Sequence, residues 1–277
     1  MTIDDIIEKA LAEDLGDGDH TSLSTIPPTA TGKAKLLVKQ LGILSGMNVA
    51  RKVFNKVDNQ IVMNDLLNNG DQIKPGDIAF TVEGPSASIL MAERLVLNFM
   101  QRMSGIATNT SLYVKQLEGL TSKILDTRKT TPLLRELEKQ AVVDGGGHNH
   151  RFGLYDMVMI KDNHVDFAGG ILNAINAANS YLSKTKRDLK IEIEVRNFDE
   201  LLLVMQHGGV HRIMLDNFNP ANLRKAVDMI GKRFETEASG GITLDTIRSY
   251  AETGVDFISV GALTHHIKSL DLSLKAF

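Results

Sequence analysis

Charged residues and glycines follow most of the short apolar runs in the second half of this sequence. The segments that follow five of these runs are Asp126-Thr127-Arg128-Lys129, Lys161-Asp162-Asn163-His164, Asp216-Asn217, Ser239-Gly240-Gly241 and Gly261. Another run, Ile191–Val195, contains Glu194 near its end. Cations of this kind can bind an anion, paired carboxylates can bind Mg²⁺, and glycine turns can bind phosphate. The elements that carry these residues decide whether they meet.

Six apolar runs after about residue 120 are expected to be strands. They are Ile124-Leu125, Met157–Ile160, Ile191–Val195, Ile213–Leu215, Glu237-Ala238 and Phe257–Val260. Because helix-length stretches follow most of them, the pattern is typical of βα units and a parallel sheet. No Gly-x-Gly-x-x-Gly follows any run, which disfavours a dinucleotide fold. The charged residues lie at the carboxyl ends, which form the active-site rim of an α/β barrel. Six units are fewer than eight, so we expect an incomplete barrel or one closed by extra elements.

The cations at this predicted rim have two interpretations. Arg128-Lys129 lies between Asp126-Thr127 and Thr130-Thr131-Pro132, and Lys161 ends another strand. Small hydroxyl residues around paired cations suit anion recognition. The alternative is solvated surface charge, the usual environment of Lys and Arg. The pattern alone favours neither.

The segment Gly145-Gly146-Gly147-His148-Asn149-His150-Arg151 joins glycines to imidazoles and a cation. Consecutive glycines let a backbone approach a ligand and expose N–H donors. A flexible linker is the alternative, although linkers are rarely followed at once by such a sequence. Two His residues two positions apart give only a weak indication of zinc.

Two acidic residues and two glycine turns complete the candidate rim. Glu194 and Asp216 are expected on successive strand ends, where they could form a structural ion-pair network or bind Mg²⁺. Ser239-Gly240-Gly241 is expected to open a helix, with Thr243 near its start, and Ser259–Ala262 repeats the device one unit later. Helix N-termini bind phosphate, whereas the simpler interpretation of each turn alone is tight-turn chemistry.

The first part of the chain predicts a different architecture. Helical spacing over Ile3–Leu11 and Ser88–Leu117 brackets strand-like segments with turn signals at Asn69-Gly70 and Pro75-Gly76-Asp77. Gly105 indicates a close approach or a bend in the second helix. We expect an N-terminal domain over residues 1–110 and a barrel domain over residues 111–267. The strand-like C-terminus, residues 268–277, is expected to return to the first domain.

Composition excludes several classes of protein. The 277 residues include 43% hydrophobic residues, no Cys, and 31 Lys+Arg against 34 Asp+Glu, a formal charge of −3. Without Cys there is no disulfide scaffold, thiolate zinc site, Cys nucleophile or iron–sulfur cluster. The balance of charge argues against a broad nucleic-acid-binding face. No apolar run approaches the roughly 18–20 residues of a membrane span, and the acidic N-terminus lacks a signal peptide's basic region, so a cytoplasmic protein is expected.

Several motifs, in order along nearly the whole chain, resemble those of the quinolinate phosphoribosyltransferases. They are Glu13–Thr21, Glu93–Ala107, Asp126–Pro132, Gly145–Asp156, Ile160–His164, Glu192–Val195, Met214–Asn217 and Ala238–Ile242. This resemblance implies an N-terminal α/β sandwich and an incomplete (β/α) barrel of about six to seven strands. It also implies that quinolinate and phosphoribosyl pyrophosphate react, with Mg²⁺, to nicotinate mononucleotide, pyrophosphate and CO₂ in NAD biosynthesis.

The same resemblance implies roles for individual residues. In a homodimer or larger homo-oligomer, Arg94 of one chain would meet a quinolinate carboxylate in its neighbour's site. Thr127, Arg128, His150, Arg151 and Lys161 would belong to the substrate pocket, with Lys129 near the pyrophosphate. Glu194 and Asp216 would bind the ribose side and its Mg²⁺, largely through substrate and water. Ser239, Gly240, Gly241 and Gly261 would hold the 5′-phosphate. Lys129, Lys161, Glu194 and Asp216 are the expected catalytic residues.

Two rival interpretations remain at this stage. One is the pyrophosphorylase-like paralogue associated with molybdenum transport, although the intact Lys161–His164 and Glu93–Gly105 stretches favour the quinolinate enzyme. The other is a non-catalytic barrel that binds phosphate sugars. Leu133 stands where the family often has Gly, and Gln140 where an aromatic residue is common. Neither departure falls on a proposed charge contact.

Overall fold

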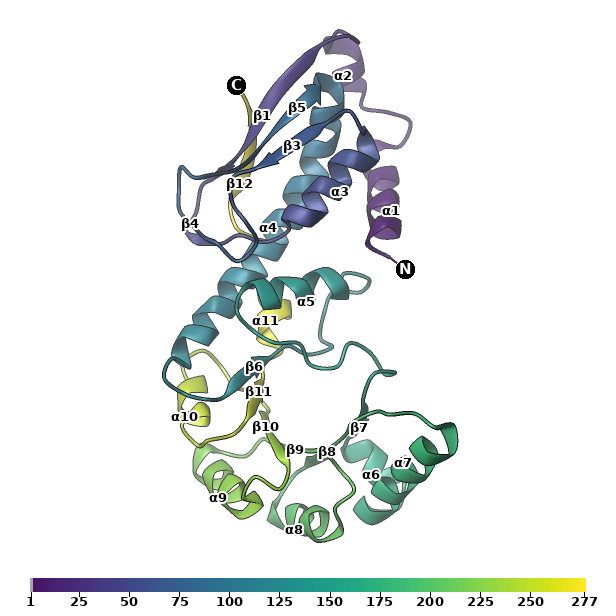
Figure 1. Ribbon diagram of the computed structural model, residues 1–277, viewed down its shortest axis with the longest axis vertical. Helices are drawn as coiled ribbons and strands as arrows, with labels where there is room; N and C mark the ends of the chain where they lie inside the picture. The colour runs from purple at the N-terminus through teal and green to yellow at the C-terminus, as the bar shows by residue number, and fades with distance from the viewer. Residues whose placement is uncertain (1) are drawn as a thin grey trace. The chain divides into compact units, whose positions relative to one another are not determined.

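The computed structural model describes residues 2–277, which divide into two compact units (Figure 1). Unit 1 contains the chain up to Ser111 together with Thr130–Gly146 and Leu263–Phe277. Unit 2 contains Leu112–Lys129 and Gly147–Ala262. Grouped by contacts, unit 1 therefore includes an internal segment, Thr130–Gly146, that the expected boundaries do not assign to it.

Unit 1 is built on a four-stranded sheet in the order β12-β1-β5-β3. Its strands and the small pair β2–β4 are β1 (Thr31–Val38), β2 (Gly42–Ile43), β3 (Val62–Asp65), β4 (Gln72–Ile73), β5 (Ile78–Pro85) and β12 (Leu272–Ala276). Its helices are α1 (Ile3–Leu15), α2 (His20–Thr25), α3 (Met47–Val57), the first part of α4 (Ser86–Gln116), α5 (Arg135–Asp144) and most of α11 (Ala262–His265). All strand pairings in this four-stranded sheet are antiparallel.

Apolar side chains attach the helices of unit 1 to this sheet. Phe54 of α3 packs edge-on against Phe80 of β5, with ring centroids 6.0 Å apart, and both rings are fully buried. The first turn of α1 is closed by a capping box: the Thr2 hydroxyl accepts the Asp5 N–H, and the Asp5 carboxylate accepts the Thr2 N–H. These features fix a mixed α/β sandwich.

The C-terminal strand completes the first sheet. β12 pairs antiparallel with β1 from Ala34↔Ala276 to Val38↔Leu272. From α4, the Gln101 side-chain amide donates to the Leu272 carbonyl at 2.9 Å. Residues more than 230 positions apart along the chain, such as Val38 and Leu272, are therefore neighbours in one sheet.

Unit 2 contains a six-stranded parallel sheet in the order β6-β11-β10-β9-β8-β7. The strands are β6 (Lys123–Leu125), β7 (Val158–Ile160), β8 (Ile191–Val195), β9 (Arg212–Asp216), β10 (Glu235–Ser239) and β11 (Phe257–Ser259). The six apolar runs of the sequence correspond to these six strands. β8 and β9 are almost wholly buried, as expected for parallel strands covered on both faces.

Helices cover the outside of this parallel sheet. They are α6 (Asp162–Phe167), α7 (Ile171–Thr185), α8 (Phe198–His207), α9 (Pro220–Ile230) and α10 (Ile247–Ala251). Figure 1 shows the strands along the inner side of an arc and α7, α8 and α9 along its outer side. The end strands β6 and β7 do not pair with each other, so the barrel is not closed. The predicted fold class, an α/β sandwich plus an incomplete barrel, is confirmed.

One expected helix begins later than the sequence suggested. Ser239 ends β10, but α10 begins only at Ile247 and has 5 residues. A turn closed by the Thr246 N–H and the Thr243 carbonyl occupies the intervening segment. The prediction that Ser239-Gly240-Gly241 opens a helix is therefore wrong, since Thr243 and Thr246 satisfy each other's polar groups in a turn instead.

No helix within residues 2–277 combines the length and the hydropathy that a membrane span requires. The cytoplasmic location stays a prediction.

Gly105 provides a test of the packing around α4. A Cβ built on this residue would overlap the carbonyl oxygen of Lys268 and lie 3.1 Å from its carbonyl carbon. We expect Gly105→Ala to lower the free energy of unfolding by about 1–3 kcal/mol, because two backbones must separate. Urea-induced unfolding measures the change. Asn98→Ala, at an exposed position of the same helix, is the control; equal stability of the two variants would contradict the close approach.

Candidate active site

The segment that follows the three glycines lies beside β6. Leu125 and His148 form an isolated parallel bridge, in which the His148 N–H donates to the Ile124 carbonyl and the Asp126 N–H donates to the His148 carbonyl. The buried Asp126 carboxylate then accepts the His150 N–H at 2.9 Å. This extra strand-like piece extends the incomplete barrel by one position. It therefore places His150 and Arg151 next to the segment Asp126–Lys129.

Two guanidinium groups come close at this position. Burial, and after it the positive charge of Arg128, lowers the pKa of Arg151. The Arg151 side chain donates to the Met157 carbonyl at 3.2 Å, which directs it along the start of β7. Because like charges repel in a partly buried place, this arrangement favours an anion between or near them. The predicted neighbours Arg128 and Arg151 are thus brought together.

The chain around Lys129 is held by local contacts. The Thr127 hydroxyl accepts the Lys129 N–H at 3.0 Å, so Thr127 shapes the turn. After it, within unit 1, the Arg102 guanidinium donates to Thr131 and to the buried Glu138 carboxylate at 2.6–2.9 Å. These contacts make Arg102 an anchor for the chain that follows Lys129.

Glu194 and Asp216 lie at the carboxyl ends of the neighbouring strands β8 and β9. Burial and the nearby Asp216 carboxylate raise the pKa of Glu194, and the cation of Lys161 opposes them. Because charges in water are screened over roughly 8–10 Å, the influence of Asp216 and Lys161 on Glu194 indicates that these three predicted residues lie in one region of the rim. A divalent cation would relieve the repulsion between the two carboxylates, and the oxygen donors suit Mg²⁺.

Asp216 is also held by its own neighbours. It accepts the Ser239 hydroxyl at 2.7 Å and the Asn217 side-chain amide at 2.6 Å. Asn217 has a left-handed backbone, φ +57°, which asparagine tolerates better than most residues. Ser239 is thus in place beside Asp216 at the rim, as expected, but its hydroxyl is already directed to that carboxylate.

The remaining predicted residues are placed by the strands and the helix that they follow or belong to. Gly240 and Gly241 follow β10 with φ of +98° and +61°, and Gly261 follows β11 and precedes α11. All three lie at the same edge of the parallel sheet as Asp216. Arg94 is exposed on α4 in unit 1.

The His150 side chain is buried and faces two carboxylates of the barrel strands. Its Nε2 atom lies 3.0 Å from Glu192 and 3.4 Å from Glu237, both completely buried. Burial lowers the pKa of His150, but the two carboxylates outweigh burial and raise it to about 9. Burial and the charge of Glu237 raise the pKa of Glu192 to about 7. Since these groups are in contact, the protons belong to the cluster as a whole.

The sequence did not single out Glu192 and Glu237. A signal was present: both are charged residues inside strands whose other residues are mostly buried, Ile191–Val195 and Glu235–Ser239. Glu192 also shares a strand face with Glu194, two residues on.

Gly145 is required by packing within unit 1. A Cβ on this residue would overlap the Ala107 carbonyl oxygen and lie 2.8 Å from the Thr110 Cβ, both on α4. The hypothesis that this glycine lets the backbone approach a ligand is therefore not needed at this position, because a helix of the chain itself makes the close approach.

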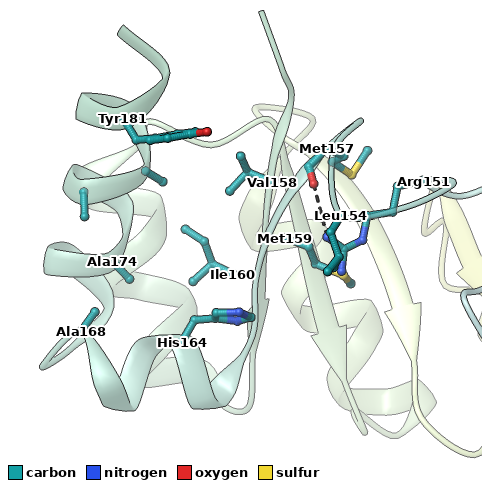
Figure 2. A pocket seen from close by; sticks show the side chains of 12 residues that line it. Arg151, Leu154, Met157, Val158, Met159, Ile160, His164, Ala168, Ala174 and Tyr181 are labelled. Carbon is teal, nitrogen blue, oxygen red and sulfur yellow. Dashed lines mark hydrogen bonds between the residues drawn. The ribbon is translucent and has the colours of Figure 1, made fainter. Parts of the chain in front are cut away.

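A cavity of about 450 Å³ lies beside β7, and Figure 2 shows side chains that line it. Val158 and Ile160 point toward α7, whereas Met159 lies on the side of Arg151. The side chains that line the cavity are mostly Ala, Leu, Ile, Val and Met, and Arg151 is the one residue that the cavity shares with the predicted site. An apolar cavity of this kind does not suit a multiply charged substrate, so we assign the site to the rim.

Two family models match the chain. The N-terminal domain of quinolinate phosphoribosyl transferase matches residues 19–104, and the C-terminal domain matches residues 106–275. The chain belongs to the quinolinate phosphoribosyl transferase family.

Relatives of this family agree over nearly the full length. The chain is 46% identical to "Quinolinate phosphoribosyltransferase [decarboxylating] 1" of Nicotiana glauca, over 98% of this chain and 81% of the relative. Among solved structures, NadC from Streptococcus pyogenes is similar with a TM-score of 0.94 and 37% identity, over 99% of this chain and 95% of that one. The nicotinate-nucleotide pyrophosphorylase from Francisella tularensis has the same TM-score and 38% identity, over 99% and 96%.

The cluster around His150 predicts a pH dependence of folding stability. An unfolded histidine releases its proton near pH 6.5, whereas in the folded protein the raised pKa of about 9 means that the cluster of His150, Glu192 and Glu237 retains one shared proton up to about pH 9. The resulting stabilisation is complete below about pH 6.5 and is lost as the pH rises through about 9. We expect urea-induced unfolding to show a loss of about 1–3 kcal/mol across this range.

His150→Gln should remove this part of the pH dependence, and His20→Gln, which changes an exposed imidazole, should retain it. The same pH dependence in wild type and His150→Gln would contradict the assignment.

Proposed function

We propose that this protein transfers the phosphoribosyl group of phosphoribosyl pyrophosphate to quinolinate. Loss of CO₂ then gives nicotinate mononucleotide and pyrophosphate, a step of NAD biosynthesis. One observation carries the assignment to this site: Arg128 and Arg151 come close enough for one to lower the pKa of the other, in a family named for quinolinate. Two adjacent guanidinium groups suit a substrate with two adjacent carboxylates.

The cations would bind and orient the pyridine dicarboxylate. Arg128 and Lys161 follow the carboxyl ends of β6 and β7, and Arg151 follows the strand-like piece beside β6. We propose that these three cations hold the two carboxylates of the substrate. His150 would support Arg151, because its Nδ1 atom accepts the Arg151 backbone N–H. The bound pyridine nitrogen then attacks C1 of the ribose, a C–N bond forms, and the C1–O bond to pyrophosphate breaks. Holding both reactants in line supplies much of the rate enhancement.

The acidic residues and Lys129 would stabilise the charges that develop. Positive charge builds on the sugar as pyrophosphate leaves, and Glu194 would stabilise it electrostatically. Lys129 would neutralise the leaving pyrophosphate. Glu194 and Asp216 would hold Mg²⁺, largely through substrate and water, and the bound ion would supply positive charge to the phosphate oxygens. The mutual repulsion of the two carboxylates supports a cation between them.

Decarboxylation follows from the change in the pyridine ring. Once its nitrogen carries the ribose, the bond from C2 to its carboxylate can break. The electron pair remains on C2 as an ylid and takes up a proton. We propose that Arg128, Arg151 and Lys161 orient the departing carboxylate without stabilising it more than the transition state. Ser239, Gly240, Gly241 and Gly261 would hold the 5′-phosphate through the N–H groups of two turns.

A direct assay tests the function. Purified protein incubated with quinolinate, phosphoribosyl pyrophosphate and Mg²⁺ should form nicotinate mononucleotide and pyrophosphate in equal amounts, and a chelator should abolish both. Absence of both products would contradict the proposal and favour the molybdenum-transport paralogue or a non-catalytic binding barrel. Use of nicotinate as the acceptor would indicate a different transferase.

Arg128→Ala is expected to weaken quinolinate binding by about tenfold or more, because a charge-assisted contact contributes about 1.5–3 kcal/mol. Isothermal titration calorimetry measures the affinity. Arg187→Ala removes an exposed cation from the end of α7 and serves as the control. Binding by Arg128→Ala equal to that of wild type would remove Arg128 from the site.

We further propose that the protein is a homodimer or larger homo-oligomer in which Arg94 completes the neighbouring chain's site. Arg94→Ala and Lys161→Ala should each be inactive alone. If Arg94 acts in trans, mixing them should restore about a quarter of the wild-type activity at full subunit exchange, since mixed dimers contain one intact site. No recovery despite exchange, shown by differently tagged chains, would contradict a shared site.

A further inference from the structure

The interior of the barrel contains a buried charged cluster, which we call the interior cluster: His150, Glu192, Arg212 and Glu237. Glu192 and Glu237 are 0% exposed, and His150 and Arg212 are 8–9% exposed. Barrel interiors are usually filled by branched apolar side chains. Both Glu192 oxygens and the Glu237 Oε1 lack a well-aligned hydrogen-bond donor among the described residues. Such a costly arrangement calls for a role.

The contacts within the cluster form a connected network. Glu192 and Glu237 come from the alternate strands β8 and β10, so their side chains meet at His150 Nε2, 3.0 and 3.4 Å away. Arg212, from the strand between them, donates to Glu237 Oε2 at 2.9 Å. Two carboxylates and one guanidinium leave one negative charge. A single shared proton therefore makes the cluster neutral, as a dry interior requires.

The cluster is connected to the rim through His150. Its Nδ1 atom accepts the backbone N–H of Arg151 at 2.6 Å, and the backbone N–H of His150 donates to the Asp126 carboxylate. Nδ1 can accept only while it carries no proton. In this arrangement the shared proton lies on the Nε2 and carboxylate side of the ring. The His150 imidazole thus fixes the backbone of Arg151. The backbone N–H of His150 also links this segment to Asp126, the residue that precedes Thr127-Arg128.

We propose that Glu192 and Glu237 are positioning residues for the dicarboxylate substrate. They hold the His150 ring in one orientation and tautomer, and the ring fixes the backbone from which Arg151 reaches the substrate. This inference rests on the proposed function, because it takes Arg151 as a contact of quinolinate. Neither glutamate touches the substrate.

A metal ion is the competing occupant of the same cluster. One ligand atom each of His150, Glu192 and Glu237 lies within 4.8 Å of the others. The Arg212 guanidinium, 2.9 Å from a Glu237 oxygen, already supplies a positive charge there. A second cation would be repelled by it, so we favour the shared proton.

Two isosteric variants test the inference. Glu192→Gln and Glu237→Gln each keep the shape and remove one charge. Glu235→Gln is the control, because Glu235 lies on the same strand β10 and accepts from the same Arg212, but its side chain is part-exposed. We expect the KM for quinolinate to rise about tenfold in the first two variants. The KM for phosphoribosyl pyrophosphate should stay within about twofold, and Glu235→Gln should resemble wild type in both.

Nuclear magnetic resonance of ¹⁵N-labelled histidine gives a second measurement that needs no variant of the glutamates. His150→Gln identifies the signal of His150. We expect an unprotonated Nδ1 and a protonated Nε2 in wild type at neutral pH. A protonated Nδ1 would overturn the inference, even if both glutamine variants failed to fold.

The other outcomes also discriminate. The positioning role would be contradicted if wild type is active and the three variants all have the same KM for quinolinate. It would also be contradicted if Glu192→Gln and Glu237→Gln raise the KM values of both substrates equally. A stoichiometric metal ion in purified wild type, lost in Glu192→Gln, would show a metal site instead. Wild type that forms no product would contradict the proposed function, whereas the tautomer measurement would still report on the cluster.

Discussion

The parallel pairing of six short strands is the constraint on which the second unit depends. Because β6, β11, β10, β9, β8 and β7 all run in one direction, every residue just past a strand end lies at one edge. This is why Glu194 and Asp216, more than twenty positions apart, influence each other's charge, and why Lys161 acts on the same carboxylate. The chemistry assigned to the rim follows from that pairing and from which residues end each strand.

The interior cluster adds a second constraint beneath the rim. A carboxylate without a partner in a barrel core is strongly destabilising, so Glu192 and Glu237 require His150, Arg212 and a shared proton. The same imidazole that lies against the two carboxylates also accepts the Arg151 N–H and so positions that backbone. If Arg151 binds the substrate as proposed, one side chain couples stability to substrate binding.

Much of this architecture could be predicted from the sequence, because strand and rim signals are local. The six apolar runs and the charged residues after them predict the parallel sheet and one edge rich in charge. The inward direction of His150 could not be predicted, since it depends on Glu192 and Glu237 meeting across alternate strands. The late start of α10 was missed because Thr243 and Thr246 pair in a turn that a glycine motif does not reveal. The packing role of Gly145 could not be predicted either, because its close neighbour, Ala107, is distant in sequence.

The central claim is that cations from separate strand ends converge on one dicarboxylate. A crystal structure of the protein with pyridine-2,3-dicarboxylate bound tests this most directly. The account predicts both carboxylates at the rim of unit 2, in contact with Arg128, Arg151 and Lys161, and the His150 ring directed away from the ligand toward Glu192. A ligand bound elsewhere, or one bound at the rim without contact to Arg128 and Arg151, would contradict it.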